Sequence, residues 1–277
     1  MAQTINTNLN SINAQRNVAG SSMAMNVAMQ RLSSGLRVNG AKDDAAGLAI
    51  SERMNAQVRG MGVAIRNAND ATSLAQTAEG GTAKIGDALQ RMRELAVQSA
   101  NGSNNAGDRD NMQTEFAELQ AEVSRLVGGT KFNGQALLDG SIASFTFQVG
   151  ASTSAQDTIT VTSSDLSTTD TAVAALDISG ATSAGATAAI DALDTAIDDV
   201  TTARANFGAT QNRFESVIAN LQVASENLTA ARSRIVDADF AVETAAMSRA
   251  SILQQAGTAM VAQANQQPQQ VLQLLRN

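Results

Sequence analysis

Residues 207–235 read FGATQNRFESVIANLQVASENLTAARSRI, and this stretch decides the fold. Its large apolar residues recur at every seventh position, and they are Phe207, Phe214, Leu221, Leu228 and Ile235. A smaller residue follows each of the first four by three positions, which is the seam spacing of packed helices. The stripe extends back to about Ala186 without a proline. We therefore predict one helix from there to Ile235, roughly 75 Å long at 1.5 Å per residue.

The N-terminal half carries a matching apolar stripe. Apolar or small residues alternate at four and three positions from Met54 to Leu95, and two acidic residues, Asp43 and Asp44, stand before the run, as they do at helix starts. Residues 101–105 read NGSNN and break the pattern, and a shorter amphipathic stretch follows over 112–126. The sequence therefore predicts a mainly α fold, in which a long antiparallel helical bundle resembles a coiled-coil rod.

The middle of the chain has a different pattern. Apolar and polar residues alternate over 145–149 and again over 159–161, which predicts a small β-hairpin around residues 150–157. Residues 141–200 hold eight Asp and no Lys or Arg, so the formal net charge of −7 comes from this part. Ser and Thr are dense over 151–187. We expect an exposed segment with little core of its own.

Both ends of the chain are amphipathic but separated from the central stripes. Candidate breaks stand at Ser33-Ser34-Gly35 with Asn39-Gly40, and at Asp237-Ala238-Asp239. Short isolated helices are marginally stable in water. We therefore expect the two ends to be mobile in a free monomer and to fold when they meet a partner.

The composition argues against an enzyme. The chain has no Cys and no His, which excludes disulfides, thiolate and histidine catalysis, and most zinc sites. The acidic balance argues against nucleic acid as a partner. The longest apolar run, Ala172–Leu176, is far too short to cross a membrane, and the N-terminus has no signal peptide of the usual kind. We expect a structural protein with no catalytic residue, no cofactor and no metal site.

Several long motifs resemble bacterial flagellins. They are RLSSGLRVN at 31–39, AKDDAAGLAIS at 41–51, GATQNRF at 208–214 and SRIVDADF at 233–240. The resemblance covers roughly residues 1–140 and 200–277, and the 60 residues between them match nothing in particular. Large members of the family insert whole outer domains there, so the chain is similar to a short flagellin.

The resemblance implies that different segments of the chain form different parts of the filament subunit. Residues 1–42 and 237–277 would be terminal helices that order on assembly and form the coiled-coil inner tube of a filament. Residues 43–140 and 186–236 would form the bundle, and 141–185 the hairpin and exposed segment. The self-assembly residues implied are Ile5, Leu9, Ile12, Met25, Met29, Leu32, Leu36, Val242, Ile252, Ala256, Val271, Leu272, Leu274 and Leu275.

The resemblance also implies partners and a location. Flagellins leave the cell unfolded through a type III export apparatus with the help of a chaperone, meet junction and cap proteins, and polymerise into the extracellular filament. They are also recognised by host flagellin receptors, including a Toll-like receptor. The receptor-recognition residues implied are Gln90, Arg91, Glu94, Leu95, Gln98 and Glu115.

Two other functions remain open from the residues. A hook–filament junction protein has flagellin-like ends and a similar bundle, but it is a minor adaptor in the flagellum. A soluble coiled-coil binding module would form a small assembly with ordered ends. The full C-terminal motif run favours flagellin over the junction protein, and early protease trimming of both ends in the monomer would count against the binding module.

Overall fold

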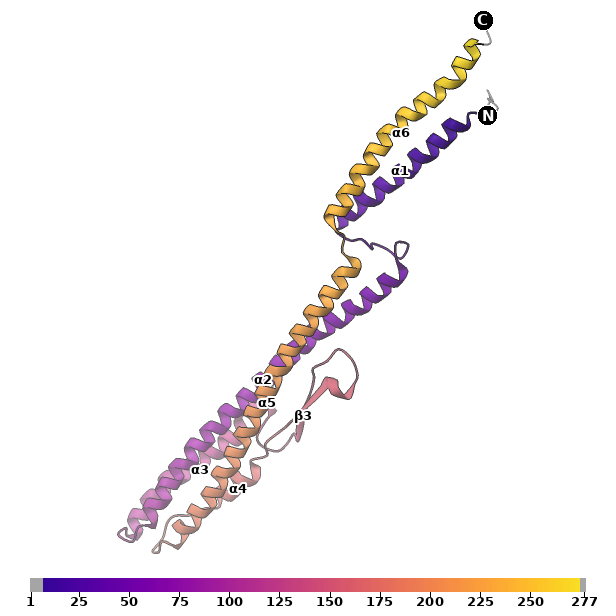
Figure 1. Ribbon diagram of the computed structural model, residues 1–277. Coiled ribbons are helices and arrows are strands. Elements are labelled where there is room, and N and C mark those ends of the chain that lie inside the picture. Colours follow the sequence, from indigo (N-terminus) through magenta and orange to yellow (C-terminus); the bar gives the residue numbers. More distant parts are fainter. Residues whose placement is uncertain (1–6, 275–277) are drawn as a thin grey trace. The chain divides into compact units, whose positions relative to one another are not determined.

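A computed structural model describes the backbone of residues 7–274 and the side chains of residues 7–266 (Figure 1). The chain divides into two compact units. The first, here the terminal unit, consists of the described residues up to Ala56 and from Asn227 onward. The second, here the central unit, is Gln57–Glu226. These limits differ from the predicted division at residues 42 and 237, which concerns the assembled filament and stays a prediction.

Long helices make up most of the described chain. In order they are α1 Leu9–Ser34, α2 Ala45–Ala100, α3 Ala106–Gly129, α4 Ser167–Ala174, α5 Ala184–Val236 and α6 Phe240–Leu274. The predicted helix from about residue 186 to Ile235 corresponds to α5, and the predicted helix after Asp44 to α2. The fold is therefore mainly α, as predicted.

Local side-chain bonds explain where two of these helices begin. The Asp44 carboxylate accepts a hydrogen bond from the Gly47 backbone N–H at 2.8 Å, at the first turn of α2. At the start of α3, Asn105 accepts from the backbone of Asp108, and the Asp108 carboxylate accepts from the backbone of Asn105. This reciprocal box satisfies donors that a helix start otherwise leaves unpaired.

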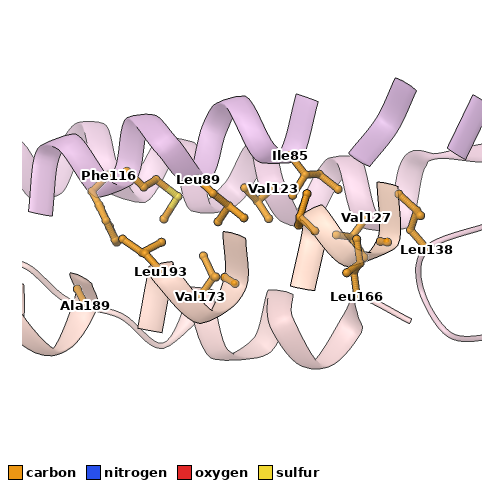
Figure 2. Close-up of a cluster of buried hydrophobic side chains, with 14 of the residues drawn as sticks. Ile85, Leu89, Phe116, Val123, Val127, Leu138, Leu166, Val173, Ala189 and Leu193 are labelled. Atoms are coloured by element: carbon orange, nitrogen blue, oxygen red, sulfur yellow. The ribbon is translucent and has the colours of Figure 1, made fainter. Parts of the chain in front are cut away.

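The core of the central unit lies between α2, α3, α4 and α5. Figure 2 shows Leu89 of α2, Phe116 of α3, Val173 of α4 and Leu193 of α5 turned toward one another. Two ion pairs fix the direction of α5 against α2, because Glu79 pairs with Arg204 and Arg93, further along α2, pairs with Asp194, earlier in α5. The two helices are therefore antiparallel.

The predicted hairpin is present in the central unit. Strand β3 Ser144–Gln148 pairs antiparallel with β4 Thr158–Thr162, and the connection, which includes the short 3₁₀ helix Ala155–Asp157, has exposed residues from 151 to 156. A second pair, β1 Lys131–Phe132 with β2 Gln135–Ala136, turns through residues 133–134, both with positive φ. These four are the strands of the described residues.

The hairpin packs onto the helices instead of standing free. Ile159 and Val161 are buried in a cluster with Ala68 of α2 and Phe214 of α5. The Phe147 ring meets the Phe214 ring edge-on, with their centroids 5.8 Å apart. The inward face of the hairpin is therefore part of the core.

The expectation of an exposed middle segment agrees with residues 151–156 and fails for the residues after the hairpin. Leu166, Val173 and Ile178 are buried in the main core, and residues 167–174 form helix α4, which the sequence did not predict. Single, widely spaced apolar residues anchor the segment to the core. Because Ser, Thr and Asp residues separate them, they form no periodic pattern in the sequence.

In the terminal unit, α1 and α6 lie side by side and antiparallel (Figure 1). The Asn8 side chain, at the start of α1, donates to the Ala264 carbonyl at 2.7 Å, late in α6. Arg31, near the end of α1, pairs with Glu243 in the first turn of α6 at 2.9 Å. Contacts at both ends of the pair therefore define one continuous helix–helix contact.

The two predicted breaks in the terminal segments are real and touch each other. Gly35 ends α1 with a φ of 70°, and its carbonyl accepts a hydrogen bond from the Ala238 N–H at 2.9 Å. Leu36 and Asp237 form an isolated antiparallel β-bridge, and the Arg37 N–H donates to the Val236 carbonyl at 2.7 Å. The backbone groups freed at the helix ends thus satisfy one another.

Candidate assembly surfaces

The terminal helices expose large apolar side chains along most of their described length. On α1 these are Leu9, Ile12, Met23, Val27 and Met29, and on α6 they are Phe240, Val242, Ile252, Leu253 and Met260. The side chains that α1 buries are smaller, because Ser11 and Ala28 are its fully buried residues. Apolar surface repeated along two neighbouring helices is typical of an interaction site.

The predicted self-assembly residues fall into three groups in the structure. Leu9, Ile12, Met29, Val242, Ile252 and Ala256 are exposed, and Met25, Leu32 and Leu36 are half-buried. Val271, Leu272 and Leu274 lie where side chains are not described, and Ile5 and Leu275 lie outside the described residues. Most of the described members are therefore available to another molecule.

The five predicted seam residues differ in burial along α5. Phe207 and Phe214 are fully buried in the central unit. Leu221, Leu228 and Ile235 are half-buried. The heptad spacing predicts the helix correctly, but the burial of the seam side chains decreases toward the C-terminal end of α5.

The predicted receptor residues surround one arginine of the central unit. Arg91 Nε donates to Glu115 Oε1 at 2.9 Å, and Arg91 Nη1 donates to Glu94 Oε2 at 2.9 Å. Hydrogen bonds to Glu94 and Glu115 raise the pKa of Arg91 above its usual value. The group is exposed, so the two ion pairs contribute little to stability and remain free to exchange partners.

The remaining predicted receptor residues do not share one environment. Gln90 and Gln98 are exposed on α2. Leu95 is only 2% exposed, and it belongs to the buried core between the helices. The structure therefore brings five of the six predicted residues to the surface and leaves Leu95 beneath it.

Sequence reasoning missed a buried arginine at the end of the central unit. Arg109 of α3 donates from Nε to the Ser99 carbonyl at 2.9 Å, from Nη1 to the Ala181 carbonyl at 3.2 Å and from Nη2 to the Asn101 carbonyl at 3.3 Å. Its side chain thus ties the end of α2 to the loop before α5. No spacing could have identified this contact, because all these acceptors are backbone carbonyls.

The described side chains contain no group of three or more acidic residues placed to hold a metal ion. Within the same residues, none of the helices combines the length and the apolar character needed to cross a membrane.

Two family models match most of the chain. The bacterial flagellin N-terminal helical region matches residues 5–143, and the bacterial flagellin C-terminal helical region matches residues 190–275. The chain belongs to the bacterial flagellin family. The stretch between the two matches holds the hairpin and α4, so this flagellin is a short form without a large outer domain.

A curated relative and one solved structure agree with this placement, and a second solved structure shares the fold. A flagellin of Halalkalibacterium halodurans is 50% identical over 272 residues, which cover 98% of this chain and 99% of that one. The crystal structure of Bacillus cereus flagellin matches with a TM-score of 0.50 and 33% identity over 60% of this chain and 94% of that one. A putative flagellar hook-associated protein from Vibrio parahaemolyticus has a TM-score of 0.60 at 15% identity, covers 70% of this chain and 100% of that one, and shows the fold alone.

Family membership establishes the general role. This flagellin is a structural subunit of the bacterial flagellar filament, and it assembles with copies of itself. The putative hook-associated protein shares the fold, so the fold alone does not identify a filament subunit. The sequence does identify one, because the matches to flagellins extend over nearly the whole chain.

Proposed function

We propose that the exposed apolar faces of α1 and α6 are the contacts between neighbouring subunits in the filament. The single observation that carries the proposal is the row of exposed Leu, Ile, Val, Met and Phe side chains along both helices. Fully burying one such side chain stabilises an interface by about 1.5–3 kcal/mol. Many copies of this contact along a helical polymer would offset the entropy lost when a subunit joins.

The terminal helices would gain order when the contact forms. Helices α1 and α6 depend on one another for burial, and their shared contact buries mainly small residues such as Ser11, Ala28 and Ala250. A free pair of this kind is weakly stabilised, so folding and association would be coupled. The predicted mobility of the ends in the monomer belongs to the same proposal.

Export in an unfolded form fits the composition. The chain has no Cys, so no disulfide holds any part of it folded. We infer passage through the flagellar export apparatus with a chaperone, followed by assembly at the outer end of the filament with the junction and cap proteins. The location would then be extracellular.

One substitution tests the subunit contact. Ile252 is exposed on α6, so Ile252→Asp should leave the monomer folded and raise the concentration needed for filament growth by about tenfold or more, because an unpaired charge would enter the interface. The matched control is Ile252→Leu, which keeps the apolar surface and should polymerise normally. Growth is measured by electron microscopy after salting-out onto short filament seeds.

Normal growth of Ile252→Asp would contradict the proposed contact.

The Arg91 cluster favours a second function, recognition by a host flagellin receptor. Arg91, Glu94 and Glu115 form an exposed group of mixed charge on two helices, with Gln90 and Gln98 beside it on α2. Such a group can exchange its own ion pairs for pairs with a partner. Arg91→Ala in the monomer should reduce receptor signalling in a reporter cell assay.

The control for this test is a similar ion pair elsewhere. Arg125 and Glu122 form an exposed pair on α3, outside the cluster, so Arg125→Ala should leave signalling unchanged. Equal signalling by Arg91→Ala and the unaltered monomer would contradict receptor recognition at this surface.

A further inference from the structure

Methionine is the side chain of this protein that peroxides attack. The chain holds ten Met and no Cys, His, Trp or Tyr, the other side chains that oxidise readily. Attack on methionine follows exposure of its sulfur. Met23 and Met260 are the most exposed of the described methionines, at 65% and 62%, whereas Met92 in the central core is at 0%.

Met23 lies on the exposed apolar face of α1. It follows Ile12 by eleven residues and precedes Val27 by four. Eleven residues are close to three turns of an α-helix and four are close to one turn, so these three exposed side chains share a face. The sulfur of Met23 therefore belongs to the surface that we propose as a subunit contact.

Met260 has the same position on α6. It follows Leu253 by seven residues and Val242 by eighteen, which are close to two and five turns. All three side chains are exposed. Met29 is also exposed, at 50%, but it stands six residues after Met23 and so lies elsewhere on the exposed apolar surface of α1.

We infer that Met23 and Met260 are oxidation sites whose conversion to methionine sulfoxide blocks subunit addition, so that peroxide inactivates the unassembled chain and spares the filament. The inference rests on the proposed function, namely that the exposed faces of α1 and α6 meet in the filament.

The chemistry needs only a peroxide. The thioether sulfur attacks one peroxide oxygen, the O–O bond breaks, and an S–O bond forms. The sulfur loses two electrons, and the second oxygen leaves as water once it has taken up the proton of the transferred oxygen. The product is a polar sulfoxide in place of an apolar thioether, which disfavours burial in an apolar contact.

The first measurement maps the sites in the full-length monomer. The monomer is treated briefly with hydrogen peroxide, digested and examined by mass spectrometry. Met23 and Met260 should be oxidised well before Met92, which is buried and serves as an internal control. In filaments treated in the same way, Met23 and Met260 should be protected. Oxidation of Met23 and Met260 no faster than Met92, or at equal rates in monomer and filament, would overturn the inference.

The second measurement tests the effect on assembly. Oxidised unaltered chain should need about tenfold more protein for seeded growth, since polar sulfoxides would enter the contact. The double variant Met23→Leu/Met260→Leu keeps apolar side chains of similar volume, and treatment with peroxide should not change its growth. Met29→Leu should remain as sensitive as the unaltered chain. Normal growth of the oxidised chain, or an equal loss in the double variant, would overturn the inference.

Two controls tie the effect to the contact. Unchanged circular dichroism and thermal melting after oxidation would show that the monomer still folds, and recovery of growth with both methionine sulfoxide reductases would show that the sulfoxides cause the block. Unfolding by oxidation, or failure of the reductases to restore growth, would count against it. Normal growth of Ile252→Asp would overturn the proposed contact itself. If growth of Ile252→Asp is arrested but the oxidised chain grows normally, the contact stands and only the inference about oxidation is overturned.

Discussion

Arg31 and Glu243 join α1 to α6 through an ion pair of 2.9 Å, and Glu243 is only 7% exposed. The arginine is nearer the surface, with about a third of its side chain exposed. The carboxylate is therefore the group that depends on the pair, because it has exchanged most of its water for one guanidinium.

Removing the arginine should loosen the terminal unit. Arg31→Met leaves a nearly buried carboxylate without its cation and should destabilise the α1–α6 pair by about 1–3 kcal/mol. Hydrogen exchange of peptides from α1 and α6 measures this effect. Arg125→Met, which breaks an exposed pair, is the control and should change exchange little. Equal protection in the two variants would contradict the importance of the pair.

Arg109 should matter more for the central unit. Arg109→Met keeps the length of the side chain but removes the guanidinium donors from the carbonyls of Ser99, Asn101 and Ala181, at an expected cost of about 3 kcal/mol. Arg109→Lys should recover only part of this, because one ammonium does not span three separated acceptors. Urea denaturation checks both, and full stability of the lysine variant would contradict the geometry.

Phe214 should be an aromatic position that tolerates truncation poorly. It is fully buried, and Phe147 of the hairpin meets its ring edge-on. Phe214→Ala should cost about 3–5 kcal/mol, because a large cavity would open beneath the hairpin. Phe240→Ala removes an exposed ring and should change the stability of the monomer by less than about 0.5 kcal/mol. Thermal melting of both variants makes the comparison.

The Arg93–Asp194 pair gives a pH dependence of known sign. Its hydrogen bond lowers the pKa of Asp194 below the ordinary aspartate value. The Asp194 carboxylate therefore holds its proton less tightly in the folded protein than in the unfolded chain. The pair stabilises the fold fully at pH values above the ordinary aspartate pKa of about 3.9. This stabilisation is lost as the pH falls through the lowered pKa of Asp194 in the folded protein. Asp194→Asn should therefore lower the melting temperature slightly at neutral pH and not at strongly acidic pH.

The long helices could be predicted from the sequence because their stripes repeat over many turns. The heptads from Phe207 onward and the run after Asp44 need no knowledge of a partner, since each reports one face of one helix. The hairpin was equally visible, because alternation over 145–149 and 159–161 has only one simple structural meaning.

Helix α4 and the burial around it could not be predicted in this way. Only one fully buried large apolar residue, Val173, lies within α4, and its other residues are mainly Ser, Thr, Ala and Asp. One or two anchors do not define a period. The tertiary contacts with α3 decide its structure, for example the Ser124 hydroxyl, which donates to the Asp170 carboxylate at 2.7 Å.

Some residues of the candidate sites could be predicted from the sequence, and others could not. Exposed apolar residues on the terminal helices, such as Leu9 and Ile252, follow from amphipathic patterns that exceed what one helix contact can bury. The burial of Leu95 inside a motif of exposed residues does not follow from a motif match, since a match does not say which face each residue occupies. The contacts of Arg109 leave no side-chain pattern at all.

The connection between β3 and β4 has a consequence for the tolerance of the chain to added sequence. Residues 151–156 are exposed, while Ile159 and Val161 hold the following strand in the core. Ala151 lies so close to α2 that a Cβ on Gly60 would meet its methyl group at 2.7 Å, so growth is best placed beyond it, between Thr153 and Ser154. A longer loop there costs only the slowly rising entropy of closure. The protein is therefore suited to carry a grafted foreign peptide at this point, displayed once per subunit.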